Sequence, residues 1–240
     1  IGQRIVAVGT NSLYTNTTGQ KNIAVGYNAL YYNTIGQNNV AIGDSAMGQN
    51  TTGIQNVAIG NSALYTNRSG VDNTAVGYTA LNLNTSGNYN TAVGSFALTA
   101  NSVGVGNSAV GYRALNNTST GSQNTAVGYQ TLKTNTIGQY NIAMGYNTMY
   151  GNSTGNFNVA IGVNALTNNT IGERNVAIGY QTLYSNTTNG SSVAVGYEAL
   201  KASTASGNVA VGQETLKANT TATDNIAVGY RAMQTNTIGG

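Results

Sequence analysis

The chain has 240 residues, of which 9 are Lys or Arg and 6 are Asp or Glu, and it contains no His, Cys, Pro or Trp. Charged residues make up 6%, against about 25% in an average soluble protein. The lack of His and Cys excludes a Ser-His-Asp triad, a thiolate nucleophile and disulfides, so we do not expect an enzyme. The net charge of +3 comes from scattered cations without a basic cluster, which predicts no nucleic-acid partner.

A short motif, Asn-x-Ala-x-Gly, recurs along the whole chain, as at residues 22–26. Its glycine returns every 17 residues, except for one step of 16 between Gly196 and Gly212. Such repeats stack into an array whose length follows the copy number. We therefore expect residues 1–240 to form a single continuous repeat array. The chain starts and ends inside a repeat, so we expect it to be a segment of a longer fibre protein.

Residues 26–42 illustrate one repeat. At 40–42, Val and Ile alternate with Ala, which predicts a strand whose Val40 and Ile42 fill the coil while Ala41 points the other way. Residues 29–31 predict a second, weaker strand, and residues 33–36 a turn in which Gly36 takes a positive φ. The many Gly, Asn and Thr residues argue against helices. These features predict an all-β fold, a parallel β-solenoid of about fourteen 17-residue coils.

Stacking of the coils turns equivalent positions into columns. Asparagine side chains carry two donors and one acceptor, so a column of them bonds from coil to coil. We expect such a structural ladder at the position four residues before the glycine: Asn22, Asn39, Asn56, Asn73, Asn90, Asn107, Asn124, Asn141, Asn158 and Asn175. The glycines that close the motif are expected to make the bend after each strand: Gly26, Gly43, Gly60, Gly77, Gly94, Gly111, Gly128, Gly145, Gly162 and Gly179.

A Leu or Met recurs four residues after the closing glycine, as in Leu30 and Met47. If Val and Ile fill the coil, this strip faces outward, and a continuous apolar stripe marks an interface. That reading predicts a homo-oligomer with the stripes of several chains meeting on the axis. The alternative is that the Leu strip completes the coil interior and the chain is a monomer.

The Asn-x-Ala-x-Gly run, followed by Ala-Leu and an Asn-Thr-x-Gly turn, resembles the head repeats of trimeric autotransporter adhesins and the related repeats of phage and viral tail fibres. The resemblance covers the whole chain and implies a left-handed β-roll in a homotrimeric fibre. It implies a structural and adhesive role in an extracellular location, on a cell surface or virion fibre. The partners it implies are further copies of the chain and host-cell surface glycans or proteins.

Three further patterns in the sequence allow alternative interpretations of function. A Thr column, with Thr17, Thr34 and Thr51 as members, suggests an ice- or surface-binding solenoid as a second function. Tyr after the closing glycine stacks on sugars or, as we prefer, covers the coil edge. Glu198 and Glu214 lie on successive coils with Lys nearby, which we interpret as solvated surface charges rather than a glycosidase pair.

No cofactor or metal site is expected, since the repeat lacks the regular Asp of calcium-binding β-rolls. No apolar run approaches the ~20 residues that span a bilayer, so we expect no membrane insertion of this segment.

Overall fold

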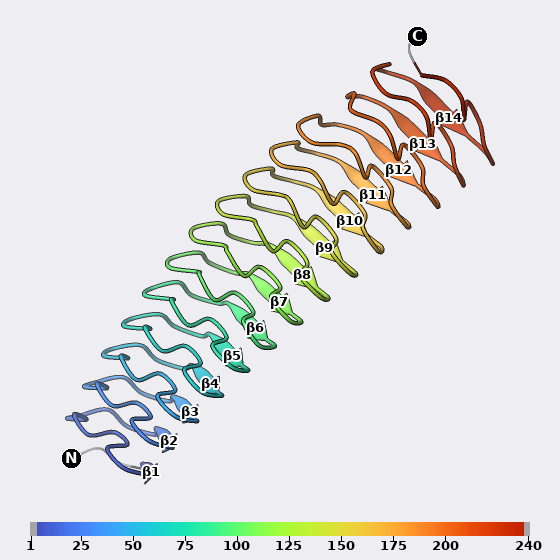
Figure 1. The fold of residues 1–240 in the computed structure, drawn as a ribbon. Coiled ribbons are helices and arrows are strands. Elements are labelled where there is room, and N and C mark those ends of the chain that lie inside the picture. Colours follow the sequence, from blue (N-terminus) through green and yellow to red (C-terminus); the bar gives the residue numbers. More distant parts are fainter. Residues whose placement is uncertain (1–3, 238–240) are drawn as a thin grey trace. The chain divides into compact units, whose positions relative to one another are not determined.

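The computed structural model describes residues 4–237 and is an all-β parallel β-solenoid without a helix in that range. Each coil contributes one three-residue strand, and the strands follow one another in chain order (Figure 1). Their bounds are β1 Val6–Val8, β2 Ile23–Val25, β3 Val40–Ile42, β4 Val57–Ile59, β5 Thr74–Val76, β6 Thr91–Val93, β7 Ser108–Val110, β8 Thr125–Val127, β9 Ile142–Met144, β10 Val159–Ile161, β11 Val176–Ile178, β12 Val193–Val195, β13 Val209–Val211 and β14 Ile226–Val228.

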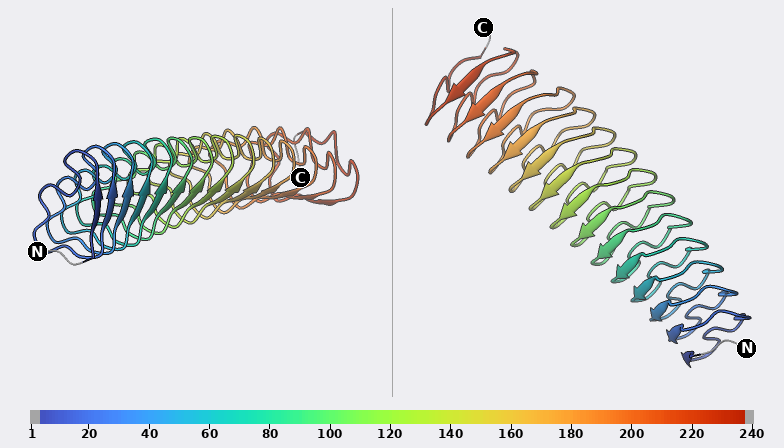
Figure 2. Two further views of the ribbon diagram at one scale, coloured as in Figure 1. Left: turned by 90° about the horizontal axis from the view of Figure 1, so that it is seen from below. Right: turned by 180° about the vertical axis from the view of Figure 1, so that it is seen from behind.

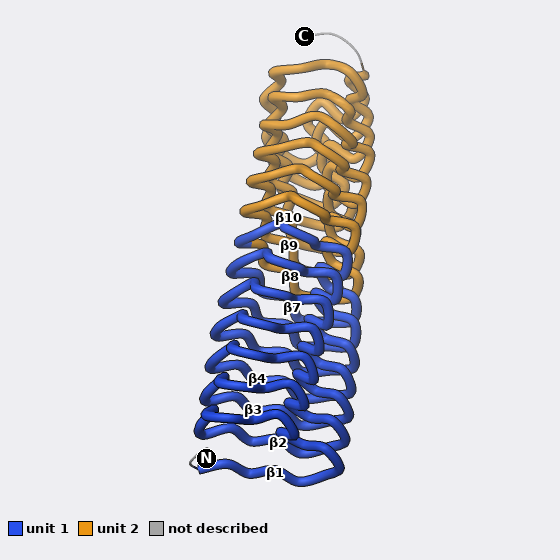
Figure 3. The backbone as a smooth tube through the Cα atoms, turned by 90° about the vertical axis from the view of Figure 1, so that its left-hand side faces the viewer, with its two compact units in different colours: residues 1–123 blue, residues 124–240 orange. Residues whose placement is uncertain are grey.

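The chain divides into two compact units, residues 1–123 with β1–β7 and residues 124–240 with β8–β14 (Figure 3). Within each unit the strands line one side of the stacked coils (Figure 2). Pairing is parallel and in register with the repeat, so that Val40, Ala41 and Ile42 pair with Val57, Ala58 and Ile59. The 17-residue period of the sequence continues across the boundary between the units.

Backbone hydrogen bonds connect neighbouring coils around their whole circumference. Between the second and third coils, Ile23 N donates to Asn39 O at the strand, and Leu30 N donates to Ala46 O at the following turn. Thr34 N donates to Thr51 O at the corner. Because the polar backbone is paired along the coil and not only in its short strand, three strand residues suffice to hold each coil.

The coil interior is the reverse of the sequence prediction. The central Ala of the strand is buried, as Ala24, Ala41 and Ala58 show at 0% exposure, whereas Ile42 and Ile59 point outward and are 39% and 38% exposed. The Leu or Met of the turn, such as Leu30, is fully buried and fills the coil. The reason is size: the coil is narrow, and the small Ala leaves room for the Leu or Met that reaches across it.

The second strand predicted at residues 29–31 is also absent, because this segment forms turns. Leu30 has a φ of 51°, and the same position is left-handed in the other coils. A left-handed residue bends the chain sharply, whereas a strand requires the extended backbone with negative φ. The turn points the Leu side chain into the coil, so the same conformation explains both the missing strand and the buried Leu strip.

The 16-residue step between Gly196 and Gly212 leaves the strands in register. β12 and β13 still pair with Val193 opposite Val209 and Ala194 opposite Ala210. A residue lost within a strand would move every later side chain to the other face. The missing residue instead lies in the corner around 203–207, where Gly207 takes a φ of 75°.

Candidate interface on the strand face

The outward side of the strands forms an apolar face, defined here by the first and third residues of each strand. These positions hold Val, Ile, Met, Thr or Ser throughout β1–β14, and none carries a charge. The more exposed apolar members away from the end strands are Ile23, Ile42, Ile59, Val93 and Val110 in the first unit and Ile142, Met144, Ile161 and Val211 in the second. A run of exposed apolar groups on consecutive strands is a contiguous patch, unlike the single apolar residues scattered over most surfaces.

The central Ala of every strand keeps this face regular. Each strand from β2 to β14 buries the same small side chain, whereas Ala7 of the end strand β1 is exposed, and the registers align Ala with Ala. Neighbouring strands therefore sit at the same height above the coil interior. The result in each unit is a face whose two rows of side chains repeat at the strand spacing of about 4.8 Å.

The predicted Asn positions lie inside the coil and bond from coil to coil. Asn39 accepts at Oδ1 from the backbone N of Asn56 at 3.0 Å, and its Nδ2 donates to Gly53 O at 2.8 Å. Asn56 Nδ2 also donates to Asn39 Oδ1 at 3.2 Å. These side chains are fully buried, so their amides complete the backbone hydrogen bonding of the corner and are not available to a ligand.

A second column of Asn at the corner bonds in the same direction. Asn50 Nδ2 donates to Asn33 Oδ1 at 2.7 Å, and Asn67 Nδ2 donates to Asn50 Oδ1 at 2.9 Å. The same amide nitrogen bonds the glycine of its own corner, as in Asn50 Nδ2 to Gly53 O at 3.2 Å. Both Asn columns therefore hold the coil shape.

The predicted bend glycines have φ values near +130°, a region that L side chains rarely adopt. They also lie against the next coil: a Cβ on Gly60 would be 2.5 Å from Gly77 O. The corner glycine, by contrast, does not take the positive φ predicted for Gly36. It is needed for space, because a Cβ there would be 2.5 Å from Gly53 O and 2.7 Å from Asn50 Nδ2.

The hydroxyls of the Thr column are used within the stack. Thr34 Oγ1 donates to Thr51 O at 3.0 Å, and Thr51 Oγ1 donates to Arg68 O at 2.9 Å. The pattern recurs in the second unit, where Thr170 Oγ1 donates to Thr187 O at 3.0 Å. Each of these hydroxyls donates its single proton to a protein carbonyl, so these members of the column present acceptors rather than free donors to a surface.

Glu198 and Glu214 are brought together, but as members of an ion-pair cluster. Lys217 Nζ lies 2.6 Å from Glu198 Oε2 and 3.0 Å from Glu214 Oε1, and Lys201 Nζ lies 2.6 Å from Glu198 Oε1. Arg231 Nε lies 2.7 Å from Glu214 Oε2. Hydrogen bonds from Lys201 and Lys217 lower the pKa of Glu198, and those from Lys217 and Arg231 lower the pKa of Glu214.

A glycosidase acid must keep its proton near neutral pH, which requires a raised pKa. The direction of both shifts is therefore opposite to what that chemistry needs. The two side chains are 9% and 11% exposed, so they are more buried than the solvated surface charges that we expected. Their partners explain how they stay charged there.

The Tyr residues after the bend are exposed and in part stacked. Tyr129 and Tyr146 stack with ring centroids 5.2 Å apart, and Tyr180 and Tyr197 stack at 5.1 Å. Tyr27 is 53% exposed. The stacked rings contact one another along the column and remain partly exposed to solvent.

Comparisons with family models, with curated proteins and with solved structures gave no match. Within residues 4–237, no helix has the length and apolar character of a membrane span, and no three His, Cys, Asp or Glu side chains are grouped as metal ligands. The strand face and the exposed aromatic columns are the features on which a function is proposed below.

Proposed function

We propose that this chain is a structural and adhesive segment of an extracellular fibre on a cell surface or virion. In this proposal the coils are left-handed and three copies associate as a homotrimer through their strand faces. The segment then displays a binding surface or carries a tip. The observation that carries the proposal is the uncharged apolar strand face that runs over consecutive strands of each unit.

Self-association is supported by the apolar side chains that remain exposed to water in the single chain. The Leu strip is buried and fills the coil, so it does not provide the interface predicted from the sequence. The Val and Ile rows take its place, with Ile42, Ile59 and Val93 each more than a third exposed. Burial of apolar surface contributes about 25 cal/mol per Å², and the repeat adds such surface with every coil.

A second copy of the chain is the occupant that fits the strand face best. The face repeats at the strand spacing, so its rows match those of an identical chain over their whole length. It has no charge that would require a partner of opposite charge. The extracellular and adhesive parts of the proposal are supported by the resemblance of the repeat motif to adhesin heads and tail fibres.

The test is the mass of the assembly in solution. We expect native mass spectrometry and sedimentation velocity to give three chains for the wild type. Ile59→Glu places a charge on the strand face and is expected to shift the protein to the monomer, since a buried unpaired charge is costly. Ile35→Glu is the matched control, because Ile35 is 50% exposed but lies at the corner. A wild-type monomer at micromolar concentration would rule out the association.

Ice binding through the Thr column is the alternative function, and the donor use of its hydroxyls does not favour it. A direct measurement separates the two functions. We expect no thermal hysteresis and no shaping of ice crystals by the wild-type protein, whereas either effect would restore the Thr column as a functional surface.

A further inference from the structure

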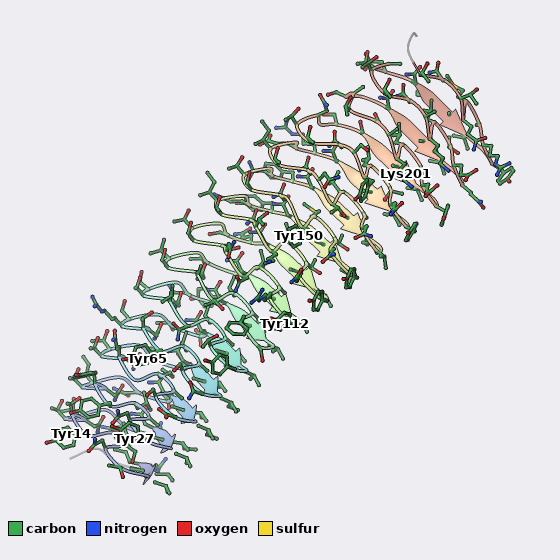
Figure 4. The ribbon with its side chains drawn as sticks, in the orientation of Figure 1. Tyr14, Tyr27, Tyr65, Tyr112, Tyr150 and Lys201 are labelled. Carbon is green, nitrogen blue, oxygen red and sulfur yellow. The ribbon has the colours of Figure 1, made fainter. Side chains whose placement is uncertain are left out.

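A hollow lined by tyrosines lies on the first unit, over the coils of β1–β4. Its volume is about 320 Å³, and Tyr27, Tyr31, Tyr32 and Tyr65 provide its aromatic walls. Figure 4 labels Tyr27 and Tyr65 at this end of the chain. The volume is at the lower end of the range for small-molecule sites, about 300–1,000 Å³.

The hollow exists because one glycine interrupts a column of tyrosines. Tyr14, Tyr31 and Tyr65 occupy the same position of their coils, five residues after the bend, and Gly48 takes that position between Tyr31 and Tyr65. Tyr14 and Tyr31 stack with centroids 5.2 Å apart and planes at 11°. Gly48 has no ring to continue the stack; the Tyr65 ring lies against the glycine, and the Tyr32 ring packs at 72° to Tyr31 with centroids 4.5 Å apart.

The side chains at two adjoining positions are also smaller than those of the preceding coil. Asp44 and Ser45 follow the bend in the Gly48 coil, where the preceding coil has Tyr27 and Asn28. Ser45 and Asn28 line the hollow and bring a hydroxyl and an amide to its walls. Asn28 Oδ1 accepts a bond of 3.2 Å from Asn11 Nδ2, which orients the Asn28 amide.

The lining combines aromatic faces with polar groups and contains no charged side chain. This combination matches a sugar ring, whose C–H face packs on the electron-rich face of an aromatic ring while its hydroxyls bond to amides and phenols. Ser45 Oγ donates to Asp44 Oδ1 at 2.7 Å and Asn28 Oδ1 accepts from Asn11, so a purely apolar ligand would leave the Asn28 Nδ2 donor and the Ser45 Oγ acceptor unused. An ionic ligand would find no counter-charge on the lining.

We propose that this tyrosine hollow, formed by Tyr27, Tyr31, Tyr32 and Tyr65 around Gly48, binds one neutral sugar ring of an oligosaccharide. A second hollow of about 420 Å³ shares Tyr32 with it and is lined further by Thr15, Thr34, Gln49, Thr51 and the cation Arg68. The chain of the oligosaccharide extends there, so a di- or trisaccharide binds more tightly than a single sugar. This site gives the proposed adhesive function a ligand class and rests on that function for its biological meaning.

The experiment uses the full chain and a printed array of defined neutral and uronic-acid-containing oligosaccharides. The best binder is then titrated by isothermal calorimetry, and saturation-transfer NMR identifies the ring in contact with tyrosine. The decisive variant is Gly48→Tyr, which continues the Tyr column through the hollow. The backbone at Gly48 accepts an L-residue, because its φ is not positive, and its neighbours in the column are Tyr31 and Tyr65.

A Cβ on Gly48 would lie 2.8 Å from Tyr65 Cε2, so the Tyr65 ring must turn aside to accommodate the new side chain. Thr99→Tyr is the matched control, since Thr99 belongs to the same column two coils beyond Tyr65 and does not line either hollow. Tyr65→Ala is a second test that removes a wall without filling the space. Circular dichroism and melting temperature establish that each variant is folded.

We expect Gly48→Tyr to abolish binding, Tyr65→Ala to weaken it about tenfold, as loss of one aromatic contact implies, and Thr99→Tyr to bind like the wild type. Absence of any binder on the array, or equal affinity of folded Gly48→Tyr and wild type, would overturn the proposal. The Ile59→Glu variant keeps the two proposals separate, because its hollow is intact. Sugar binding by a monomeric protein would remove the trimer and leave the sugar site standing.

Discussion

At the scale of residues, the coil depends on left-handed backbone at positions that are not glycine. In the β3 coil, Ser45, Met47 and Gln55 have φ values of 55°, 48° and 60°, and the corresponding residues of the other coils are similar. A left-handed L-residue costs about 1–2 kcal/mol. The hydrogen bonds between coils offset this cost, because Met47 N donates to Ala63 O and Gln55 N donates to Gln37 O.

Gln55→Gly should therefore stabilise the protein by about 0.5–1 kcal/mol, since glycine adopts this φ without strain. Glycine already occupies the same register at Gly106 and Gly207. Gln37→Gly is the matched control: Gln37 is also exposed, but its φ is not positive, so the extra backbone freedom should destabilise by a similar amount. Urea unfolding of the two variants gives both values, and shifts of the same sign would contradict the explanation.

One position of the corner Asn column leaves buried polar atoms without hydrogen-bond partners. Thr118 replaces Asn in the first unit, and both its Oγ1 and the Oδ1 of Asn101 are buried without a partner. Elsewhere in that unit the corresponding amides bond, as Asn84 Nδ2 does to Asn67 Oδ1 at 2.9 Å. A buried unsatisfied polar group costs about 1–3 kcal/mol.

Thr118→Asn is expected to repair this column and raise the free energy of unfolding by about 1–2 kcal/mol. The new Nδ2 would reach Asn101 Oδ1, as in the neighbouring coils. Asn84→Thr is the reciprocal variant and should lose about as much, because it creates the same defect beside Asn67. Thermal melts of both proteins provide the measurement, and an unchanged or lower stability of Thr118→Asn would refute the repair.

At the scale of elements, the sequence allowed the period, the strand at 40–42 and its parallel stacking to be predicted, because Gly and alternating Val, Ala and Ile mark them directly. It did not allow the inward face to be assigned. The two Val or Ile positions of the strand and the one Leu position of the turn recur in every coil, so either set could fill the interior. Hydrophobicity alone favours the two Val or Ile side chains over the single Leu. The left-handed turn at Leu30 decides the matter, and nothing in the residue type of Leu predicts that conformation.

The site was predictable to a similar degree. The Asn and Gly columns followed from their recurrence, whereas the tyrosine hollow depends on a break in recurrence. Gly48 stands where Tyr14, Tyr31 and Tyr65 stand in other coils, and this signal was present in the aligned repeats. To recognise that this break forms a hollow, one must know the distance and orientation of the stacked rings, which the sequence alone does not provide.

The ion-pair cluster is the element whose strength depends on pH. The pKa of Glu198 is held below its ordinary value of 4.5 by Lys201 and Lys217, and that of Glu214 by Lys217 and Arg231. A lowered pKa in the folded state means that the unfolded chain takes up protons first as the pH falls. The contribution of the cluster is therefore complete above about pH 4.5 and is lost as the pH falls through the lowered values.

We expect the melting temperature to drop between about pH 6 and about pH 3, with Glu198→Gln showing a smaller drop than the wild type. Glu198→Gln should already be less stable at pH 6, because Lys201 and Lys217 lose a charged partner. Asp72→Asn is the control, since Asp72 is exposed and belongs to no ion pair among residues 4–237. Parallel pH profiles for the wild type and Glu198→Gln would exclude the cluster as the acid-sensitive element.

At the scale of the whole molecule, the scarcity of charge determines how the chain meets other molecules. Only 15 of its residues are Lys, Arg, Asp or Glu, from 9 cations and 6 anions, and none of them is on the strand face. Association through that face therefore receives no electrostatic contribution. Its driving force is the removal of Val and Ile side chains from water, which is insensitive to screening by salt.

The proposed trimer should accordingly survive an increase in NaCl from about 0.1 M to about 1 M, because screening weakens ion pairs and leaves apolar burial in place. Ammonium sulfate should strengthen it, since excluded salts favour burial of apolar surface. Sedimentation equilibrium at each salt concentration measures the association constant. Dissociation in 1 M NaCl would mean that charged groups outside the strand face hold the chains together, and the scattered cations, rather than the Val and Ile rows, would then be the place to look for the contact.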